Sequence, residues 1–365
     1  MVKELAKRVL PRPLHGPAKQ VYRRLKNVMV SMAPAEQDSP RPQVEPRLPA
    51  REAHEAHEEF SKRYFADIPV DLSRFGHFSG RKFPNAGPLA WLDRPDARWE
   101  IDRRLRENLI TPEVARICRD FHDQGFVVLK GLLSPAQLDQ TWARYEQAIR
   151  EGRLTQATEK KGPDDPHPSN TINAHTVVPE IQQLISCDEV LRKVRLLLGV
   201  EPLPFQTLVF PKGREQLAHS DSVHMTTYPL GYMCATWTAF EDIHPDSGPL
   251  MYYPGSHRLP YVFARDVGIS PEEFQQRTYL SVIEKYEPFI ARVLESSGLQ
   301  QQVFLPKKGD VLVWHANLIH GGSTRHDVKH SRRSLVCHYF GKGAFAYHDI
   351  SGQPADRLTS SYDLM

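Results

Sequence analysis

Between residues 205 and 340 the chain alternates short apolar runs with glycine- and proline-containing turns. In the clearest run, residues 234–240, Ala235, Trp237 and Ala239 share one face and threonines occupy the other, which is the two-residue period of a strand. Further strands are expected at residues 205–210, 311–314 and 334–340. Short strands separated by such turns favour a closed or sandwiched antiparallel sheet over a doubly wound one.

Helical patterns flank this β-rich region. Thr111 and Pro112 have the residue types of a helix N-cap and first helical position, and Gly125 is expected to end that helix before a short buried strand at 126–129. Further helices are predicted at residues 134–151, 179–198 and 271–298. The predicted fold class is therefore mainly β with flanking helices.

The composition excludes several classes of protein. The chain has 365 residues and a formal net charge of +3, so it lacks the basic excess of a nucleic-acid-binding protein. It contains no apolar run of membrane-spanning length, hence no transmembrane segment, and no secretory signal pattern. Four widely spaced cysteines are expected to be buried thiols in a reducing cytoplasm, and we predict a cytoplasmic protein: Cys118, Cys187, Cys234 and Cys337.

The N-terminal third has a different character. Residues 1–32 form a basic segment with apolar residues at helical spacing, which is typical either of a helix on a membrane surface or partner, or of a helix packed on its own domain; the second is favoured. Within a helix-like stretch, His54 and His57 are three residues apart, whereas a zinc-protease helix needs four, so they are interpreted as a solvated face.

We predict four parts of the chain. They are a basic amphipathic segment at 1–32, a proline-rich linker and irregular extension at 33–109, the β-rich domain at 110–345 and a C-terminal tail at 346–365.

A candidate metal site lies at His219-Ser220-Asp221. Residues two apart on a strand point to the same side, so His219 and Asp221 can face one point while Ser220 turns away. An imidazole and a carboxylate so arranged supply two corners of a 2-His-1-carboxylate facial triad, which leaves positions open for a co-substrate and O₂. A second histidine is available about a hundred residues later, at His320.

Several blocks in this order resemble one family. They are residues 121–136 (FHDQGFVVLKGLLSPA), 216–221 (QLAHSD), 237–257 (WTAFEDIHPDSGPLMYYPGSH), 309–323 (GDVLVWHANLIHGGS) and 331–339 (SRRSLVCHY). Together they resemble the phytanoyl-CoA dioxygenase family of iron(II)/2-oxoglutarate oxygenases, over about residues 110–345. The resemblance implies a double-stranded β-helix, that is, a cupin-like jelly-roll of two antiparallel sheets flanked by helices.

The resemblance also implies roles for individual residues. His219, Asp221 and His320 would be the iron ligands and hence the catalytic residues. His315 is a rival third ligand, although the family's ligand is the histidine directly before the Gly-Ser turn, which here is His320.

The co-substrate site is expected around the last strand. The family places an arginine after the distal histidine to pair with the remote carboxylate of 2-oxoglutarate, and Arg332 and Arg333 both qualify. Arg332 is preferred, because on a strand it shares a face with Ser334, and a guanidinium beside a hydroxyl suits a carboxylate. Trp237 matches a family tryptophan near the cofactor, unless it is a core aromatic, and Gln206 is a further candidate contact.

The implied activity is hydroxylation of an unactivated C–H bond, with succinate and CO₂ as co-products. It would require Fe(II), 2-oxoglutarate and O₂, with ascorbate as a reductant in vitro. Asp221 favours hydroxylation, since related halogenases lack this carboxylate, although desaturation or epimerisation stay open. The basic N-terminus is compatible with a carrier- or lipid-linked substrate and with a peripheral membrane location.

Substrate contacts are less well defined. Residues 154–175 form a long polar loop that we interpret as either a lid over the substrate or a surface connection. Candidate contacts are Asn170, Thr171 and Asn173 in this loop, and Lys212, Ser222, His224 and Thr227 near the ligand strand.

Two other classes of function are compatible with parts of the pattern. One is a non-catalytic jelly-roll that binds a ligand or partner, which the presence of all three ligands disfavours. The other is a zinc hydrolase on the same residues, which would give no reason for the Arg332–Ser334 pair.

Overall fold

The computed structural model describes residues 89–154, 170–277, 279–351 and 353–354. The predictions for residues 1–32, for His54 and His57 and for most of the polar loop fall outside these ranges. Within them, no helix has both the length and the apolar character needed to cross a bilayer. All four cysteines are free thiols; three are buried, while Cys187 is half-buried.

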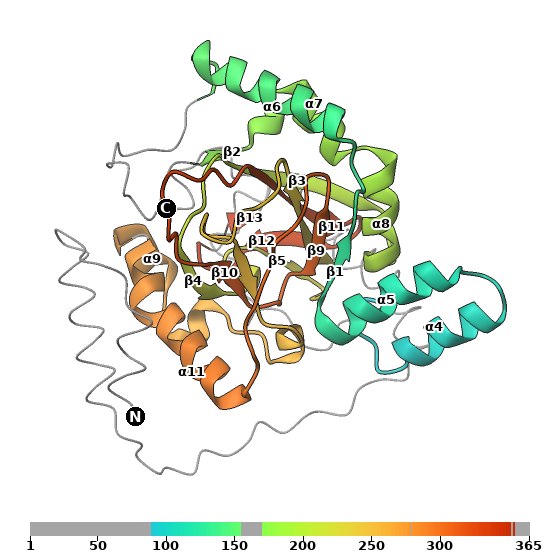
Figure 1. The fold of residues 1–365 in the computed structure, drawn as a ribbon. Coiled ribbons are helices and arrows are strands. Elements are labelled where there is room, and N and C mark those ends of the chain that lie inside the picture. Colours follow the sequence, from blue (N-terminus) through green and yellow to red (C-terminus); the bar gives the residue numbers. More distant parts are fainter. Residues whose placement is uncertain (1–88, 155–169, 278, 352, 355–365) are drawn as a thin grey trace. The chain divides into compact units, whose positions relative to one another are not determined.

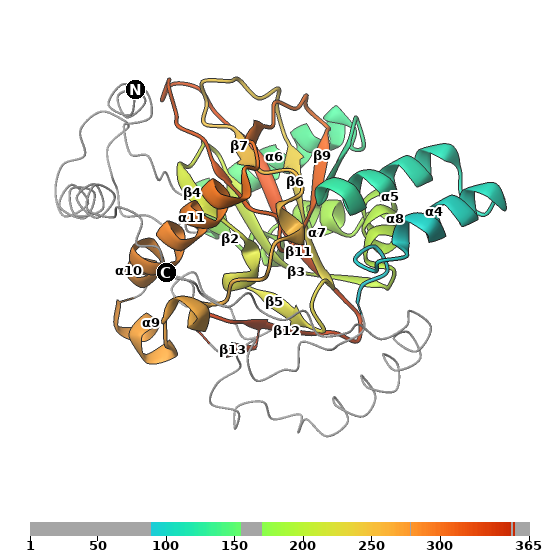
Figure 2. The same ribbon diagram turned by 90° about the horizontal axis from the view of Figure 1, so that it is seen from below.

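The strands form three antiparallel sheets (Figure 1). The largest has the order β1 (Phe126–Leu129), β9 (Val311–His315), β6 (Met233–Ala239), β11 (Ser334–Gly341), β3 (Pro202–Phe210) and β2 (Thr171–Ile172). The second has the order β4 (Gln216–His219), β10 (His320–Gly322), β7 (Leu250–Tyr252) and β8 (Gln302–Val303). The third joins β13 (Gln353–Pro354), β12 (Phe345–His348) and β5 (Thr226–Tyr228), with β12 and β5 side by side in Figure 2. This arrangement confirms the predicted jelly-roll.

The strand period divides the large sheet into two apolar faces. Val127, Val313 and Cys337 belong to a core shared with the preceding helices. Their neighbours along the strands point the opposite way, and Trp237 and Trp314 belong to a second core inside the jelly-roll. Because every strand of the large sheet except β2 supplies both cores, a shift of one residue in register would exchange them.

Helices cover the sheets on two sides. α5 (Pro112–Gln124), α6 (Pro135–Arg150), α7 (Pro179–Ile185) and α8 (Asp188–Leu198) pack on the large sheet. α5 begins as predicted, with the Thr111 hydroxyl accepting from the Val114 backbone N–H at 3.2 Å. α9 (Pro271–Arg277), α10 (Tyr279–Ser281), a π-helical turn (Val282–Tyr286) and α11 (Glu287–Ser297) lie on the side of β4 and β10.

Two predicted helices are interrupted. The helix expected at 179–198 is two helices, because Cys187 adopts an extended backbone and α8 restarts with Asp188 and Glu189 in its first turn. The helix expected at 271–298 contains the π-helical turn just before Pro288, which has no backbone N–H to continue the helical ladder.

The packed unit is longer than predicted at both ends. Helix α4 (Ala97–Arg106) lies in the stretch expected to be irregular, and its Ile101 joins the same core as α5. Only two of its ten residues are buried, which is why the apolar period was too weak to predict a helix. At the expected C-terminal tail, β12 pairs with β5 on one side and with β13 on the other, which extends the unit to residue 354.

Gly125 provides a test of the packing between α5 and the jelly-roll. Its φ is +80°, and an added Cβ would lie 2.5 Å from the His257 ring, whereas a Cβ added at Gly131, with φ +57°, would have no neighbour within 4 Å. Gly125→Ala should lower the free energy of unfolding by about 1–3 kcal/mol more than Gly131→Ala, because it adds overpacking to the same backbone strain. Urea unfolding of the two variants measures the difference, and equal midpoints would refute this packing account.

Candidate metal centre

The pairing of β4 with β10 brings the two predicted histidine ligands together. His219 and His320 are Cα partners across this antiparallel ladder, and their ring centroids are 4.6 Å apart. Strand β4 ends at His219, so Asp221 lies in a 3-10 turn (Asp221–Val223) rather than in the predicted strand. Nevertheless, ligand atoms of all three buried side chains lie within 4.8 Å of one another.

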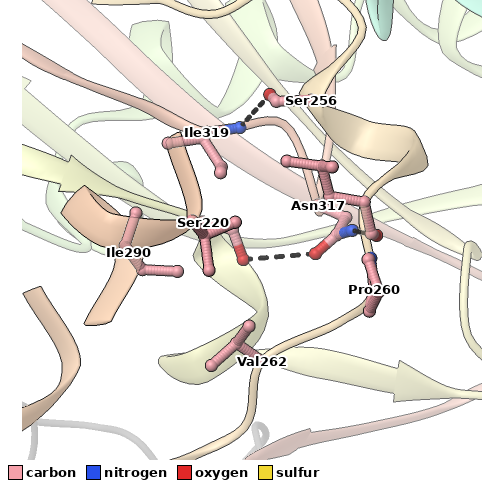
Figure 3. Close-up of a pocket in the computed structure, with 9 residues that line it drawn as sticks. Ser220, Ser256, Pro260, Val262, Ile290, Asn317 and Ile319 are labelled. Carbon is pink, nitrogen blue, oxygen red and sulfur yellow. Dashed lines mark hydrogen bonds between the residues drawn. The ribbon is translucent and has the colours of Figure 1, made fainter. Parts of the chain in front are cut away.

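Ser220 turns away from this point, as predicted, into a small pocket behind the ligand strand (Figure 3). Its hydroxyl donates to the Asn317 side-chain oxygen at 3.4 Å, and its backbone N–H donates to the Tyr286 hydroxyl at 3.3 Å. On the other ligand strand, the Ile319 N–H donates to the Ser256 hydroxyl at 2.8 Å. These bonds hold the backbone at Ser220, between His219 and Asp221, and at Ile319, next to His320.

The two imidazoles are oriented by the backbone. Nδ1 of His219 lies 2.9 Å from the Leu217 carbonyl oxygen, and Nδ1 of His320 lies 3.0 Å from that of Leu318. Each Nδ1 therefore carries the proton and donates it, and each Nε2 presents a lone pair. Burial, with the neighbouring His320 and His224, lowers the pKa of His219 to about 3, so the ring is neutral at physiological pH, as metal binding requires.

The two oxygens of Asp221 have different surroundings. Oδ2 accepts from the Trp314 indole N–H at 2.8 Å and lies 3.6 Å from Nε2 of His338, while Oδ1 lies 3.6 Å from Nε2 of His320. Burial by itself would raise the pKa of Asp221, but His320 and His338 outweigh it and hold that pKa well below its usual value. The carboxylate is thus ionised, with one oxygen fixed and the other turned toward the histidines.

His315, the rival third ligand, has both ring nitrogens in other contacts. Its Nδ1 accepts from the Asn317 backbone N–H at 3.0 Å, and its Nε2 lies 3.2 Å from the Asp93 carboxylate. It is not in the cluster of candidate ligands. The sequence left this choice open, and the geometry favours His320.

The two candidate arginines differ in environment. Arg332 is 3% exposed; its guanidinium lies 5.5 Å from the Phe210 ring and 5.7 Å from that of Trp237, and one terminal nitrogen donates to the Gly248 carbonyl at 2.9 Å. Arg333 is exposed and lies 3.8 Å from carboxylate oxygens of Glu146 and Glu241.

Arg332 and Ser334 both carry buried polar atoms that lack a partner among the residues described. These atoms are Nε of Arg332 and Oγ of Ser334. Burial, with Arg325 nearby, lowers the pKa of Arg332 to about 10, so it stays cationic at neutral pH. A buried cation and a hydroxyl with unused hydrogen-bonding capacity fit an incoming carboxylate.

The other predicted contacts separate into two groups. Trp237 and Gln206 lie inside the jelly-roll, and His224 lies with its ring 5.6 Å from that of His219. Thr171 and Asn173, in contrast, serve the helix side: one contacts the Tyr145 hydroxyl at 2.8 Å, and the other accepts from the Thr207 N–H at 3.3 Å.

The side chains of three further predicted substrate contacts are engaged elsewhere or exposed. The hydroxyls of Ser222 and Thr227 donate to backbone carbonyls, and Lys212 is exposed. Two residues that the sequence reasoning missed, Trp314 and His338, approach Asp221 instead. The only signal in the sequence was strand alternation. It places Trp314 on the same face of β9 as Leu312, and His338 on the same face of β11 as Ser334, and both faces point into the jelly-roll.

Two histidines and a carboxylate converging inside a jelly-roll, beside a buried arginine, define the class of iron(II)/2-oxoglutarate-dependent dioxygenases. A family model described as phytanoyl-CoA dioxygenase (PhyH) matches residues 121–334, more than half of the chain. The chain therefore belongs to the phytanoyl-CoA dioxygenase family.

Individual relatives are distant. The peroxisomal phytanoyl-CoA dioxygenase of Mus musculus is 23% identical over 311 residues, which cover 78% of this chain and 85% of that protein. The Homo sapiens protein of the same name is 23% identical over 276 residues, covering 70% and 75%.

Solved structures agree in fold. The apoform of EctD from S. alaskensis matches with a TM-score of 0.52 and 20% identity over 70% of this chain and 87% of that one. The non-heme alpha ketoglutarate dependent carbocyclase SnoK matches with 0.51 and 19%, over 69% and 90%.

The Trp314–Asp221 hydrogen bond predicts an effect on metal affinity. Trp314→Phe removes the indole N–H but keeps an aromatic ring, so it should weaken metal binding by about 10–100-fold, the usual effect of losing an outer partner of a ligand. Trp142→Phe is the matched control, because that buried indole donates to Glu146 at 2.7 Å on the helix side. Metal titration of both variants decides the matter, and equal affinities would refute the role of Trp314.

Four buried histidines predict acid sensitivity of the metal-free protein. Burial lowers the pKa to about 3 for His219, His257 and His348 and to about 4 for His224. Below the unfolded value of about 6.5 the unfolded state binds more protons, so stability is lost as the pH falls, by up to about 1.4 kcal/mol per pH unit for each histidine. Urea unfolding in chelator near pH 7 and near pH 5 tests this; unchanged stability would show that these rings are not buried neutral.

Proposed function

We propose that His219, Asp221 and His320 hold iron(II), and that Arg332 and Ser334 hold the remote carboxylate of 2-oxoglutarate. The reaction we propose is hydroxylation of an unactivated C–H bond in a small or carrier-linked metabolite. The observation that carries the proposal is the presence, inside one jelly-roll, of the three converging candidate ligands and of a buried arginine whose Nε has no partner among the residues described.

The donor set fits iron(II). Two imidazoles and one ionised carboxylate face one point, and each is oriented by a further hydrogen bond. Trp314 engages Oδ2 of Asp221, which leaves Oδ1 for the metal. Three protein ligands leave coordination positions for a co-substrate and O₂.

The inner face of β11 links the clamp to the metal site. Ser334, Val336 and His338 follow one another on that face, and His338 reaches Asp221. A dicarboxylate extending from the metal would thus have its far end beside Ser334 and Arg332, where the planar guanidinium can bind it through two hydrogen bonds. The Phe210 and Trp237 rings flank the guanidinium and exclude water, which strengthens the ion pair.

When bound, iron(II) and 2-oxoglutarate supply the oxidising chemistry, in which O₂ decarboxylates the oxoacid to succinate and CO₂ and leaves one oxygen for the substrate. The protein's residues bind and orient the reactants and keep water out. If iron is bound, Asp221 would supply the carboxylate ligand whose place a halide would need, which supports hydroxylation. SnoK shares the fold and is named a carbocyclase, so the fold alone does not fix the outcome, and product analysis must.

Succinate formation is the primary test. Under air, with iron(II) and ascorbate, the wild-type protein should convert 2-oxoglutarate to succinate, and candidate acyl, sugar and amino-acid substrates should stimulate turnover. His219→Ala should abolish the metal-dependent conversion, since it removes a ligand. Equal succinate yields from the two proteins would exclude the proposed site.

The clamp predicts a difference between the adjacent arginines. Arg332→Gln should weaken 2-oxoglutarate binding to the anaerobic iron-loaded protein by at least about 30-fold, because a buried charged hydrogen-bond partner is typically worth 2 kcal/mol or more. Arg333→Gln, the matched control on the exposed face, should change it less than about threefold. Calorimetric titration measures both, and the reverse order would assign the clamp to Arg333.

A further inference from the structure

Two buried acceptors lie directly opposite each other inside the jelly-roll. Gln206 on β3 and His338 on β11 are Cα partners in the antiparallel ladder, so their side chains leave the sheet on the same face. Each is 2% exposed. Oε1 of Gln206 and Nδ1 of His338 have no hydrogen-bond partner among the residues described.

The neighbouring carboxylate determines which nitrogen of His338 carries the proton. Nε2 lies 3.6 Å from Oδ2 of Asp221. Nδ1 of His338 has no acceptor among the residues described, whereas Nδ1 of His320 donates to the Leu318 carbonyl, so the N–H of His338 lies on Nε2, facing the carboxylate, and its lone pair on Nδ1. His338 therefore offers an acceptor at Nδ1, as Gln206 does at Oε1. The opposite side of the His338 ring faces Asp221, a candidate metal ligand.

These acceptors lie at the metal end of the sheet, away from the carboxylate clamp. In the β3–β11 ladder, Phe210 pairs with Ser334 at the clamp, Leu208 pairs with Val336, and then Gln206 pairs with His338. A carboxylate has only acceptor atoms, so the far end of 2-oxoglutarate could not satisfy this pair. A ligand that does so must bring a donor.

We propose that Gln206 and His338 form a substrate subsite that accepts hydrogen bonds from a hydroxyl or N–H group next to the carbon that is oxidised. This inference rests on the proposed function and names the class of its substrate. It also replaces the sequence prediction that Gln206 contacts the co-substrate. Phe205, whose ring lies 6.1 Å from that of His338 and 5.3 Å from that of Phe340, gives the subsite an apolar flank.

The subsite selects against substrates that are purely hydrocarbon near the reacting carbon. Such a molecule would cover both acceptors without pairing them, and unpaired buried polar groups are costly. A site built to bind a donor rejects the analogue that lacks it far more strongly than an apolar pocket rejects an added methylene. We therefore expect at least about tenfold discrimination between an alcohol and its methyl ether.

Matched probes test the subsite. Small alcohols, each paired with its O-methyl ether, are titrated into protein loaded with nickel(II) and 2-oxoglutarate, which cannot turn over. In wild type the alcohols should bind at least about tenfold more tightly than the ethers, and Gln206→Leu should remove the preference. Thr207→Val is the control, because Thr207 is next on the strand but contacts His175 on the helix side. Absence of any preference, or its survival in Gln206→Leu, would overturn the subsite.

Two further readouts separate this inference from the proposed function. If Gln206→Leu lost 2-oxoglutarate binding, Gln206 would belong to the co-substrate and the subsite would be overturned while the oxygenase stood. If wild type bound the alcohols selectively but not 2-oxoglutarate, the oxygenase would be excluded and the subsite would stand. In zinc-loaded protein with ¹⁵N-labelled histidine, the His338 signal, assigned by its loss in His338→Phe, should show the proton on Nε2; a proton on Nδ1 would also overturn the subsite.

Discussion

The ladder between β4 and β10 is the constraint on which the site depends. It pairs His219 with His320 across about a hundred residues of sequence and holds the two rings at a centroid distance of 4.6 Å. A shift of one residue would turn one ring to the opposite face. On the side of the ladder away from the candidate ligands, the Ser220–Asn317 and Ile319–Ser256 hydrogen bonds and the apolar packing of α11 stabilise the register between β4 and β10.

The residues on the inner face of β11 lie along the line from the candidate arginine clamp to the candidate metal ligands. Ser334 lies at one end of this face, with Arg332 just before the strand, and His338 lies at the other end, beside the Asp221 carboxylate. The proposed clamp and the proposed substrate subsite thus lie at opposite ends of the ladder between β11 and β3. On β3 and β11, the buried polar side-chain atoms without a partner among the residues described are Oε1 of Gln206, Oγ of Ser334 and Nδ1 of His338. A largely apolar interior can therefore bind polar ligands at a few defined points.

Much of this was predictable from the sequence. The period of two along β6 and β11 predicted the strands and separated Arg332 from Arg333, and the His-x-Asp spacing predicted two candidate ligands. Local patterns could not decide between His315 and His320, because that choice depends on Asp93 and Asn317, which only the fold brings to His315. They also missed α4, which buries only two residues, and β12, whose pairing with β5 is long-range.

The contacts around Asp221 were beyond sequence reasoning for the same reason. Trp314 and His338 lie 93 and 117 residues from Asp221 in the chain, and each resembles an ordinary core residue on a strand. Conversely, Thr171 and Asn173 resembled ligand contacts because they are polar and lie near a long loop. Their side chains instead satisfy hydrogen bonds where β2 and β3 meet the helices.

An anaerobic crystal structure of the iron(II) and 2-oxoglutarate complex, with anomalous diffraction at the iron edge, tests the central claim most directly. The account predicts one iron bound by Nε2 of His219 and His320 and by one oxygen of Asp221, with the remote carboxylate of the co-substrate on Arg332 and Ser334. Iron bound by His315, or a carboxylate held away from Arg332, would contradict it.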